Sequence, residues 1–321
     1  MRRDYQINQI LMTKYALVFP GQGSQSRGMM NAYADFSVVR DTFAEASDVL
    51  KQDLWQLVAE GSDADLNATV NTQPVMLAAG VAVYRAWQSL KAPVPALMAG
   101  HSLGEYTALV ASGALKFADA LPLVRYRAEC MQQAVPEGVG GIAAILGLDD
   151  AVVREVCKEA AQAEVLEAVN YNSPGQIVIA GNRAAVERGM ELAKAKGAKR
   201  ALPLPVSVPS HCALMKPAGE ALARYLESVS MQAPAVAVLQ NADVAAFSAA
   251  AEIKAALVRQ LYSPVRWVET VQKIAAEGVA QAAECGPGKV LAGLNKRIAA
   301  DMKCIALTDS AAISALLVEL K

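Results

Sequence analysis

One short segment of the chain has the residue types and spacing of a serine nucleophile. Residues 100–104, GHSLG, fit the pattern G-x-S-x-G and lie between a short apolar run, residues 96–99, and a helix-forming stretch, residues 105–112. Glycines beside the serine permit a sharp strand-to-helix turn that lifts the hydroxyl above the sheet and directs the next amide at a developing oxyanion. We predict that Ser102 is a nucleophile. The alternative is a glycine-rich turn with a capping serine.

A serine hydroxyl barely ionises at neutral pH, so a nucleophilic serine needs a neighbouring base, which is most often histidine. The chain has two histidines. His101 is adjacent to Ser102 in the turn, and we expect its side chain to point away from the hydroxyl. By elimination His211 is the predicted base, although a lone histidine can also be purely structural.

An acid that would hold the imidazole is not evident. In α/β-hydrolases it falls between the serine and the histidine in the chain. The aspartates of that interval, Asp119, Asp149 and Asp150, all occupy positions typical of helix starts or of the surface. We therefore expect a Ser–His dyad whose imidazole is oriented by a backbone carbonyl or an amide side chain.

A buried positive charge is predicted one helix further along the chain. The inner face of that helix is marked by apolar residues, namely Leu121, Val124, Ala128 and Met131. At 100° per residue Arg127 falls within this apolar stripe, while Arg125 and Glu129 fall outside it as a solvated pair. An arginine in such a stripe needs an anion, and its planar fork suits a carboxylate. The alternative is an arginine at the edge of the stripe that reaches water.

The elements that must position these residues follow an α/β pattern. Residues 15–19 and 96–99 read as buried strands, with helices near residues 38–50 and 74–91, and strands recur near residues 236–240 and 304–307. Alternating strands and helices predict an α/β fold with a mostly parallel sheet.

The middle of the chain has a different order of elements. Strands are predicted at residues 141–148, 165–170, 176–180 and 200–206, and helices at 149–162 and 182–196. This βαββαβ order is that of a ferredoxin-like unit. We predict a large α/β domain built from residues 12–135 and 206–321, with a small domain inserted at residues 136–205.

Composition narrows the classes of partner. The chain of 321 residues is 54% apolar and 19% charged with a net charge of −1, so we expect a well-packed protein that does not bind nucleic acid. The sequence has no run of eighteen mainly apolar residues, so we predict no membrane span. Residues 1–12 lack the apolar core of a signal peptide, and we treat residues 1–11 as an N-terminal extension. Five scattered cysteines favour reduced thiols in a cytoplasm over a disulfide framework or a zinc site.

Taken together, six segments resemble one known family. They are PGQGSQ (20–25), GHSLGEY (100–106), NSPGQ (172–176), VSVPSH (206–211), QLYSP (260–264) and GPGK (286–289). In this order and spacing they resemble the bacterial malonyl-CoA:acyl carrier protein transacylases of type II fatty acid synthesis. The resemblance covers residues 13–320. It implies an α/β-hydrolase-like domain that carries a ferredoxin-like insertion.

The resemblance also implies a role for each matching residue. Ser102 would be the nucleophile and His211 its base, with the backbone carbonyl of Gln260 orienting the imidazole. The backbone amides of Gln22 and Leu103 would form the oxyanion hole, since the glycines on either side of Gln22 let the backbone approach the acyl oxygen closely. Arg127 would then bind the free carboxylate of the malonyl group.

The implied reaction is ping-pong transfer of malonyl from malonyl-CoA to the phosphopantetheine thiol of acyl carrier protein, with no metal or bound cofactor. Three alternatives stay open. A serine hydrolase or thioesterase would share the elbow but lose the acyl group rapidly to water. A polyketide-type acyltransferase would take another extender unit, and the small Ser210 before the histidine does not exclude a methyl branch. A non-catalytic carrier-protein-binding subunit would have no reason to keep Ser102, His211 and Gln260 together.

Overall fold

The computed structural model describes residues 14–136, 138–205 and 208–320 of the chain. Its larger part surrounds a five-stranded sheet in the order β7-β2-β1-β8-β9, in which every neighbouring pair is parallel. The strands are β1 (Tyr15–Phe19), β2 (Leu97–Gly100), β7 (Val238–Leu239), β8 (Gln281–Glu284) and β9 (Lys303–Ala306). This confirms the predicted mixed α/β fold with a parallel sheet.

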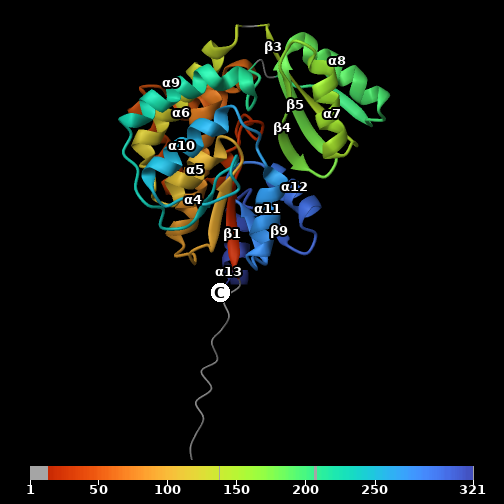
Figure 1. Ribbon diagram of the computed structural model, residues 1–321. Coiled ribbons are helices and arrows are strands. Elements are labelled where there is room, and N and C mark those ends of the chain that lie inside the picture. Colours follow the sequence, from red (N-terminus) through yellow and green to blue (C-terminus); the bar gives the residue numbers. More distant parts are fainter. Residues whose placement is uncertain (1–13, 137, 206–207, 321) are drawn as a thin grey trace, which may run out of the picture.

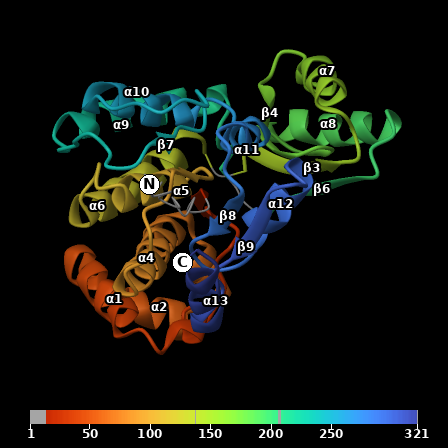
Figure 2. The ribbon, with the colours of Figure 1, turned by 90° about the horizontal axis from the view of Figure 1, so that it is seen from below.

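Both faces of the central strand β1 are covered, which explains its unbroken apolar sequence. Tyr15, Leu17 and Phe19 belong to the larger core, on the side of α4 and α5. Ala16 and Val18 belong to a second core against α11 and α12, on the opposite side of the sheet (Figure 2).

The helices around this sheet follow the predicted alternation. In chain order they are α1 (Ser37–Leu50), α2 (Leu54–Glu60), α3 (Asp63–Asn67), α4 (Thr69–Ser89), α5 (Gly104–Ala111), α6 (Phe117–Ala134), α9 (Lys216–Glu227), α10 (Ala250–Leu261), α11 (Trp267–Ala276), α12 (Val290–Ile298) and α13 (Ser310–Leu320), with 3-10 turns η1 (Asn31–Tyr33) and η2 (Ala213–Met215). Helix α4 begins five residues before Pro74, the predicted start. The run from Thr72 to Val83 is buried throughout, so packing outweighs the local cost of a proline inside the helix.

The smaller part of the molecule is a four-stranded sheet in the order β4-β5-β3-β6, with every neighbouring pair antiparallel. Its elements follow the predicted βαββαβ order: β3 (Gly140–Leu146), α7 (Asp150–Ala161), β4 (Leu166–Ser173), β5 (Gln176–Asn182), α8 (Arg183–Ala195) and β6 (Arg200–Pro203). Helices α7 and α8 cover one face and share a core with the sheet (Figure 1).

Several strand ends in this part differ from the prediction by one to three residues. Strand β4 runs on to Ser173, so the connection to β5 is a two-residue turn, Pro174-Gly175, in place of a four-residue one. Gly175 has a φ of +70°, which lets so short a turn close. Strand β6 ends at Pro203, three residues before the predicted end at 206, and residue 206 itself lies outside the described residues.

The small sheet meets the larger part of the molecule along β4. The backbone of Tyr171 donates to the carbonyl of Val265 at 3.0 Å, and the amide of Val265 donates to the carbonyl of Val169 at 2.8 Å. Because Val265 leads directly into α11, this contact fixes the small sheet against the carboxyl end of the large one (Figure 1). The carboxyl end of a parallel sheet is where ligands usually bind.

Other expectations concern the chain as a whole. In the part of the chain that the structure describes, no helix combines the length and the apolar character needed to cross a membrane. The five cysteines are all free thiols. The predicted N-terminal extension, residues 1–11, lies outside the described residues, as do residues 12 and 13 at the start of the predicted large domain.

Candidate active site

Ser102 lies on a tight turn between β2 and α5, at the carboxyl end of the parallel sheet. Its φ is +51°, a backbone conformation that residues other than glycine rarely adopt. A Cβ at Gly100 would overlap the backbone of Gly104, and a Cβ at Gly104 would overlap the carbonyl of Phe19. Both glycines of the G-x-S-x-G pattern are therefore required by close backbone approach, and the turn has the geometry of a nucleophile elbow.

His211 stands next to the serine. Its Nε2 is 2.8 Å from Oγ of Ser102, and its Nδ1 is 2.7 Å from the backbone carbonyl of Gln260. A carbonyl can only accept, so Nδ1 must carry the proton and Nε2 must present its lone pair to the serine hydroxyl. In this tautomer the imidazole can accept the proton of Ser102.

The environment keeps this imidazole neutral. His211 is only 2% exposed, and burial together with the positive charge of Arg127 lowers its pKa to about 3. An ordinary histidine has a pKa of about 6.5. The neutral form, the only one that can act as a base, is therefore present throughout the physiological pH range.

The other histidine has a different partner. Nε2 of His101 is 2.8 Å from Oδ1 of Asn172 in β4, and its ring packs against Trp267. The contact with Asn172 joins the elbow to the small sheet, so the side chain of His101 turns toward β4 while the hydroxyl of Ser102 faces His211.

The three aspartates between Ser102 and His211 lie at helix starts. Asp119 and Asp150 are in the first turns of α6 and α7, and Asp149 is the residue that precedes α7. In the described residues the imidazole is oriented by the carbonyl of Gln260, where a triad would have a carboxylate.

Arg127 lies inside the site and is only 1% exposed. Its Nη1 donates to Oε1 of Gln73 at 2.8 Å, and its Nη2 donates to Oε1 of Gln260 at 2.9 Å and to Oγ of Ser102 at 3.3 Å. Its Nε has no partner in the described part of the chain. Arg127 is thus held by two amide oxygens next to the serine, and it does not reach solvent from the edge of the stripe.

The guanidinium has no hydrogen-bonded carboxylate among the described residues. The buried acid Glu105 influences its charge, but burial raises the pKa of Glu105 to about 8, so this carboxyl is mostly neutral at pH 7. Burial also lowers the pKa of Arg127, because the charged form is desolvated. A carboxylate arriving beside Ser102 would meet a preorganised and under-neutralised donor.

Two residues near Arg127 depart from the sequence-based expectations. The pairing of Arg125 with Glu129 is wrong: Arg125 donates to Oε1 of Gln52. Gln260 contributes more than the backbone carbonyl that the resemblance implied. Its side-chain Nε2 also donates to the carbonyl of Ser102 at 2.9 Å, while its Oε1 accepts from Arg127. One residue therefore holds the histidine, the arginine and the serine backbone.

The loop that carries Gln22 lies against the elbow. A Cβ built on Gly21 would overlap the carbonyl of His101 and would lie 3.7 Å from the backbone nitrogen of Leu103. Only a glycine at position 21 lets the two backbones approach this closely. The loop of Gln22 and the backbone of Leu103 therefore border the same space beside Ser102. This is the arrangement that an oxyanion hole requires.

Two further residues were not found by sequence reasoning. Gln73 in α4 holds Arg127, and Asn241, which follows β7, makes hydrogen bonds to the backbone of the elbow. Gln73 lies within an apolar helix, where a lone glutamine is a weak signal. Asn241 is 139 residues from Ser102 in the chain, and no local pattern marks it.

Comparison with known proteins agrees with this geometry. Residues 16–307 match the model of the acyl transferase domain. The malonyl CoA-acyl carrier protein transacylase of Haemophilus influenzae is 57% identical, over 95% of this chain and 98% of its own length. The Escherichia coli K12 protein of the same name is 54% identical, over 95% and 99%. The chain belongs to the malonyl CoA-acyl carrier protein transacylase family.

Solved structures of the family superpose closely on this chain. The acyl-carrier-protein S-malonyltransferase of Burkholderia pseudomallei 1710b is 59% identical with a TM-score of 0.94, over 95% of this chain and 100% of that one. A malonyl-transacylase in complex with its type II PKS acyl carrier protein is 52% identical with a TM-score of 0.95, over 96% and 100%. The elbow, dyad and buried arginine therefore lie in a fold that the family shares.

The two histidines can be distinguished by the reactivity of Ser102 toward a serine-directed fluorophosphonate, followed by intact-protein mass spectrometry. His211→Ala should slow labelling by about 10²–10⁴-fold, because general-base assistance is lost. His101→Ala is the matched control and should slow it much less, since His101 faces Asn172. Equal losses in the two variants would contradict the assignment of His211 as the base.

The same reaction has a predicted pH dependence. Below its pKa the ring of His211 is protonated and cannot accept the serine proton, so activity falls only as the pH approaches that value. With the pKa lowered to about 3 by burial, the labelling rate should stay level from pH 8 down to about 5. A profile that is half-maximal at about pH 6.5, the pKa of an unperturbed histidine, would contradict the buried neutral imidazole.

Proposed function

We propose that the protein transfers the malonyl group of malonyl-CoA to the phosphopantetheine thiol of an acyl carrier protein, through an ester on Ser102. The observation that carries this proposal is the buried Arg127, whose Nη2 lies 3.3 Å from the serine hydroxyl and has no hydrogen-bonded carboxylate among the described residues. The names of the family's members supply both substrates, malonyl-CoA and acyl carrier protein. The malonyl carrier protein formed would serve fatty acid synthesis, as the resemblance of the sequence motifs implies.

In the first half-reaction Oγ of Ser102 attacks the thioester carbon of malonyl-CoA, and Nε2 of His211 takes the hydroxyl proton. The backbone amides of Gln22 and Leu103 stabilise the oxyanion of the tetrahedral intermediate. The carbon–sulfur bond then breaks, and the imidazolium returns its proton to the departing CoA sulfur. The carbonyl of Gln260 keeps the ring in the productive tautomer in both directions.

In the second half-reaction the phosphopantetheine thiol of the carrier protein attacks the ester carbon. Nε2 of His211 accepts the thiol proton and donates it to Oγ of Ser102 as the ester bond breaks. The same donors stabilise the second oxyanion, so the enzyme returns to its starting state. These steps use only side chains and amides of this chain, and we propose that no metal or bound cofactor takes part.

Arg127 decides which acyl group is carried. Its guanidinium would bind the free carboxylate of the malonyl group while Gln73 and Gln260 fix its orientation. A serine hydrolase with the same elbow has no use for this charge and would have to admit water to the ester. We therefore favour transfer over hydrolysis, and a malonyl group over an uncharged acyl group.

We extend the proposal to the architecture. The order β4-β5-β3-β6 with two helices on one face is that of a ferredoxin-like unit, and the elbow at the end of β2 is that of an α/β-hydrolase-like domain. These features support a large domain of residues 12–135 and 206–321 around a small domain of residues 136–205. Free thiols and a CoA thioester substrate favour a cytoplasmic location.

Arg127→Ala tests the substrate class. Removing one partner of a buried charge pair costs roughly 2–5 kcal/mol, so kcat/KM for malonyl transfer should fall by about 30- to 4,000-fold. Acetyl-CoA leaves the arginine unpaired in the native site, so acetyl transfer should hold or improve. Arg127→Lys should recover only part of the malonyl activity, since a point charge cannot form a bidentate fork.

The measurement is kcat/KM for both thioesters with one carrier protein. A parallel fall of malonyl and acetyl transfer in Arg127→Ala would mean that the arginine supports the fold or the geometry of the serine, and it would remove the main physical support for a malonyl substrate.

A further inference from the structure

The side chain of Asn241 bonds to the elbow backbone on both sides of His101. Its Oδ1 accepts from the backbone N–H of Ser102 at 2.7 Å, and its Nδ2 donates to the carbonyl of Gly100 at 2.6 Å. The side chain is 1% exposed, so these bonds do not compete with water. An amide has both a donor and an acceptor, which is what this pair of backbone groups needs.

The elbow needs such support because its backbone is strained. Ser102 has a φ of +51°, and a residue held in that region persists only where its surroundings determine it. Gly100 and Gly104 make the turn sterically possible, but they do not select it over other conformations. The two hydrogen bonds from Asn241 are specific to this turn, because they fix the residue before His101 and the residue after it.

The backbone of Asn241 is itself held by Glu105 of α5 and by Arg266, the residue that precedes α11. Its backbone N–H donates to Oε2 of Glu105 at 2.6 Å, and its carbonyl accepts from the backbone N–H of Arg266 at 3.3 Å. Glu105 is fully buried in the first turn of α5, directly after the elbow. Elbow, Glu105 and Asn241 therefore close a ring of hydrogen bonds at the start of α5.

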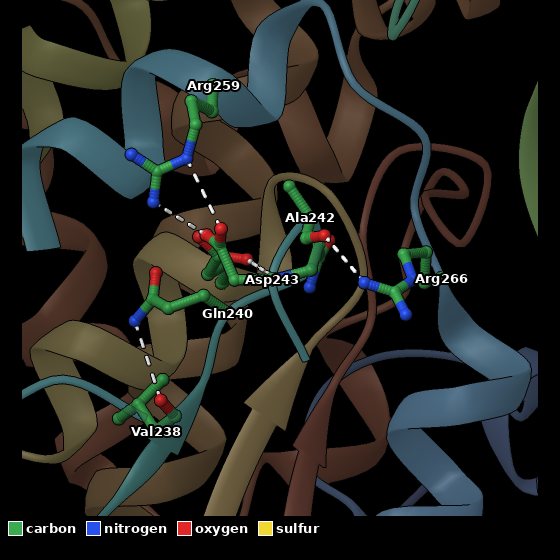
Figure 3. Close-up of polar contacts among 8 residues, drawn as sticks. Val238, Gln240, Ala242, Asp243, Arg259 and Arg266 are labelled. Atoms are coloured by element: carbon green, nitrogen blue, oxygen red, sulfur yellow. Dashed lines mark hydrogen bonds and ion pairs between the residues drawn. The ribbon is translucent and has the colours of Figure 1, made fainter. Parts of the chain in front are cut away.

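Two arginines hold the residues that follow (Figure 3). Nη1 of Arg266 donates to the carbonyl of Ala242 at 3.2 Å, and the guanidinium of Arg259 contacts both carboxylate oxygens of Asp243 at 2.9 and 3.3 Å. Arg259 immediately precedes Gln260 in α10. The loop that carries Asn241 is thus tied to the helix end that orients the histidine.

We propose that Asn241 is a positioning residue for the nucleophile, which holds Ser102 in its strained conformation and keeps the hydroxyl aligned with His211. The proposal rests on the proposed acyl transfer through Ser102. Asn241 acts through the backbone and contacts no acyl group, so it should affect the acylation of Ser102 equally for every acyl donor.

The test uses the full chain with the substitutions Asn241→Ala and Asn241→Asp. Single-turnover acylation by malonyl-CoA and by acetyl-CoA is followed by intact-protein mass spectrometry. A displacement of the reacting atom by about 1 Å can cost on the order of 10²-fold, and we expect a loss of this size for both donors in Asn241→Ala. The malonyl-to-acetyl ratio should stay at the native value, whereas Arg127→Ala would change it.

The matched control is Gln240→Met, the neighbouring buried side chain of the same loop. In the described part of the chain the side chain of Gln240 makes no hydrogen bond to the elbow, and its Nε2 makes only a 3.5 Å contact with the carbonyl of Val238 (Figure 3). Methionine has a similar length and shape. This variant should acylate at close to the native rate, so a loss confined to Asn241 variants is not a general effect of altering the loop.

Asn241→Asp carries a signature that a merely structural role would not produce. Aspartate keeps the acceptor for Ser102, but an ionised carboxylate cannot donate to the carbonyl of Gly100. The groups facing position 241 are Glu105 from α5 and Arg266, the residue that precedes α11, with the Asp243–Arg259 pair alongside. The protonated acid restores the donor, so the acylation rate of this variant should rise as the pH falls, while the native rate stays level.

Each result decides the proposal. A large loss in Asn241→Ala with an unchanged donor ratio, together with partial recovery of Asn241→Asp at low pH, supports it. Near-native acylation in either variant at all pH values overturns it, as does a loss in Asn241→Asp that acid does not relieve. If neither variant unfolds cooperatively on heating, Asn241 is a structural residue and the positioning role is rejected. Failure of native protein to acylate would instead reject the proposed function.

Discussion

The site is organised around a positive charge that is buried without a hydrogen-bonded carboxylate in the described part of the chain. Moving a guanidinium out of water is costly, and amide oxygens compensate only partly. Gln73 and Gln260 hold Arg127 beside the serine, and the raised pKa of Glu105 leaves that neighbour mostly neutral at pH 7. The same charge helps to keep His211 neutral. A substrate carboxylate would pair with the buried charge of Arg127. The choice of acyl group and the neutral state of His211 would then both follow from the position of this one guanidinium.

The second requirement is a serine held in a conformation that the chain would not adopt alone. Contacts from four separate parts of the sequence meet at the elbow: Gly21 from the first loop, Asn172 from the small sheet, Asn241 from the loop after β7, and Gln260 from the end of α10. None of these contacts is local in sequence. The small sheet therefore contacts the elbow directly, through the hydrogen bond between His101 and Asn172.

Sequence patterns predicted those features that depend on interactions within a short segment of the chain. The apolar run of β1, the glycines around Ser102 and the stripe position of Arg127 each follow from close packing or backbone geometry, and the structure agrees with them. Strand β8, Gln281–Glu284, was not predicted, because its sequence QAAE has no β-branched or aromatic residue and is a strand only through pairing with β1 and β9. Asn241 and the side chain of Gln260 were missed for a related reason, since their partners are distant in sequence.

The most direct test of the account is a competition between malonyl-CoA and acetyl-CoA at equal concentrations, without carrier protein, with the acyl-enzyme identified by intact mass and peptide mapping. The buried charge of Arg127 predicts a persistent malonyl ester on Ser102 with little acetyl ester beside it. Comparable amounts of the two esters would contradict the pairing of Arg127 with the substrate carboxylate. Release of free malonate with no accumulated ester would contradict a transferase.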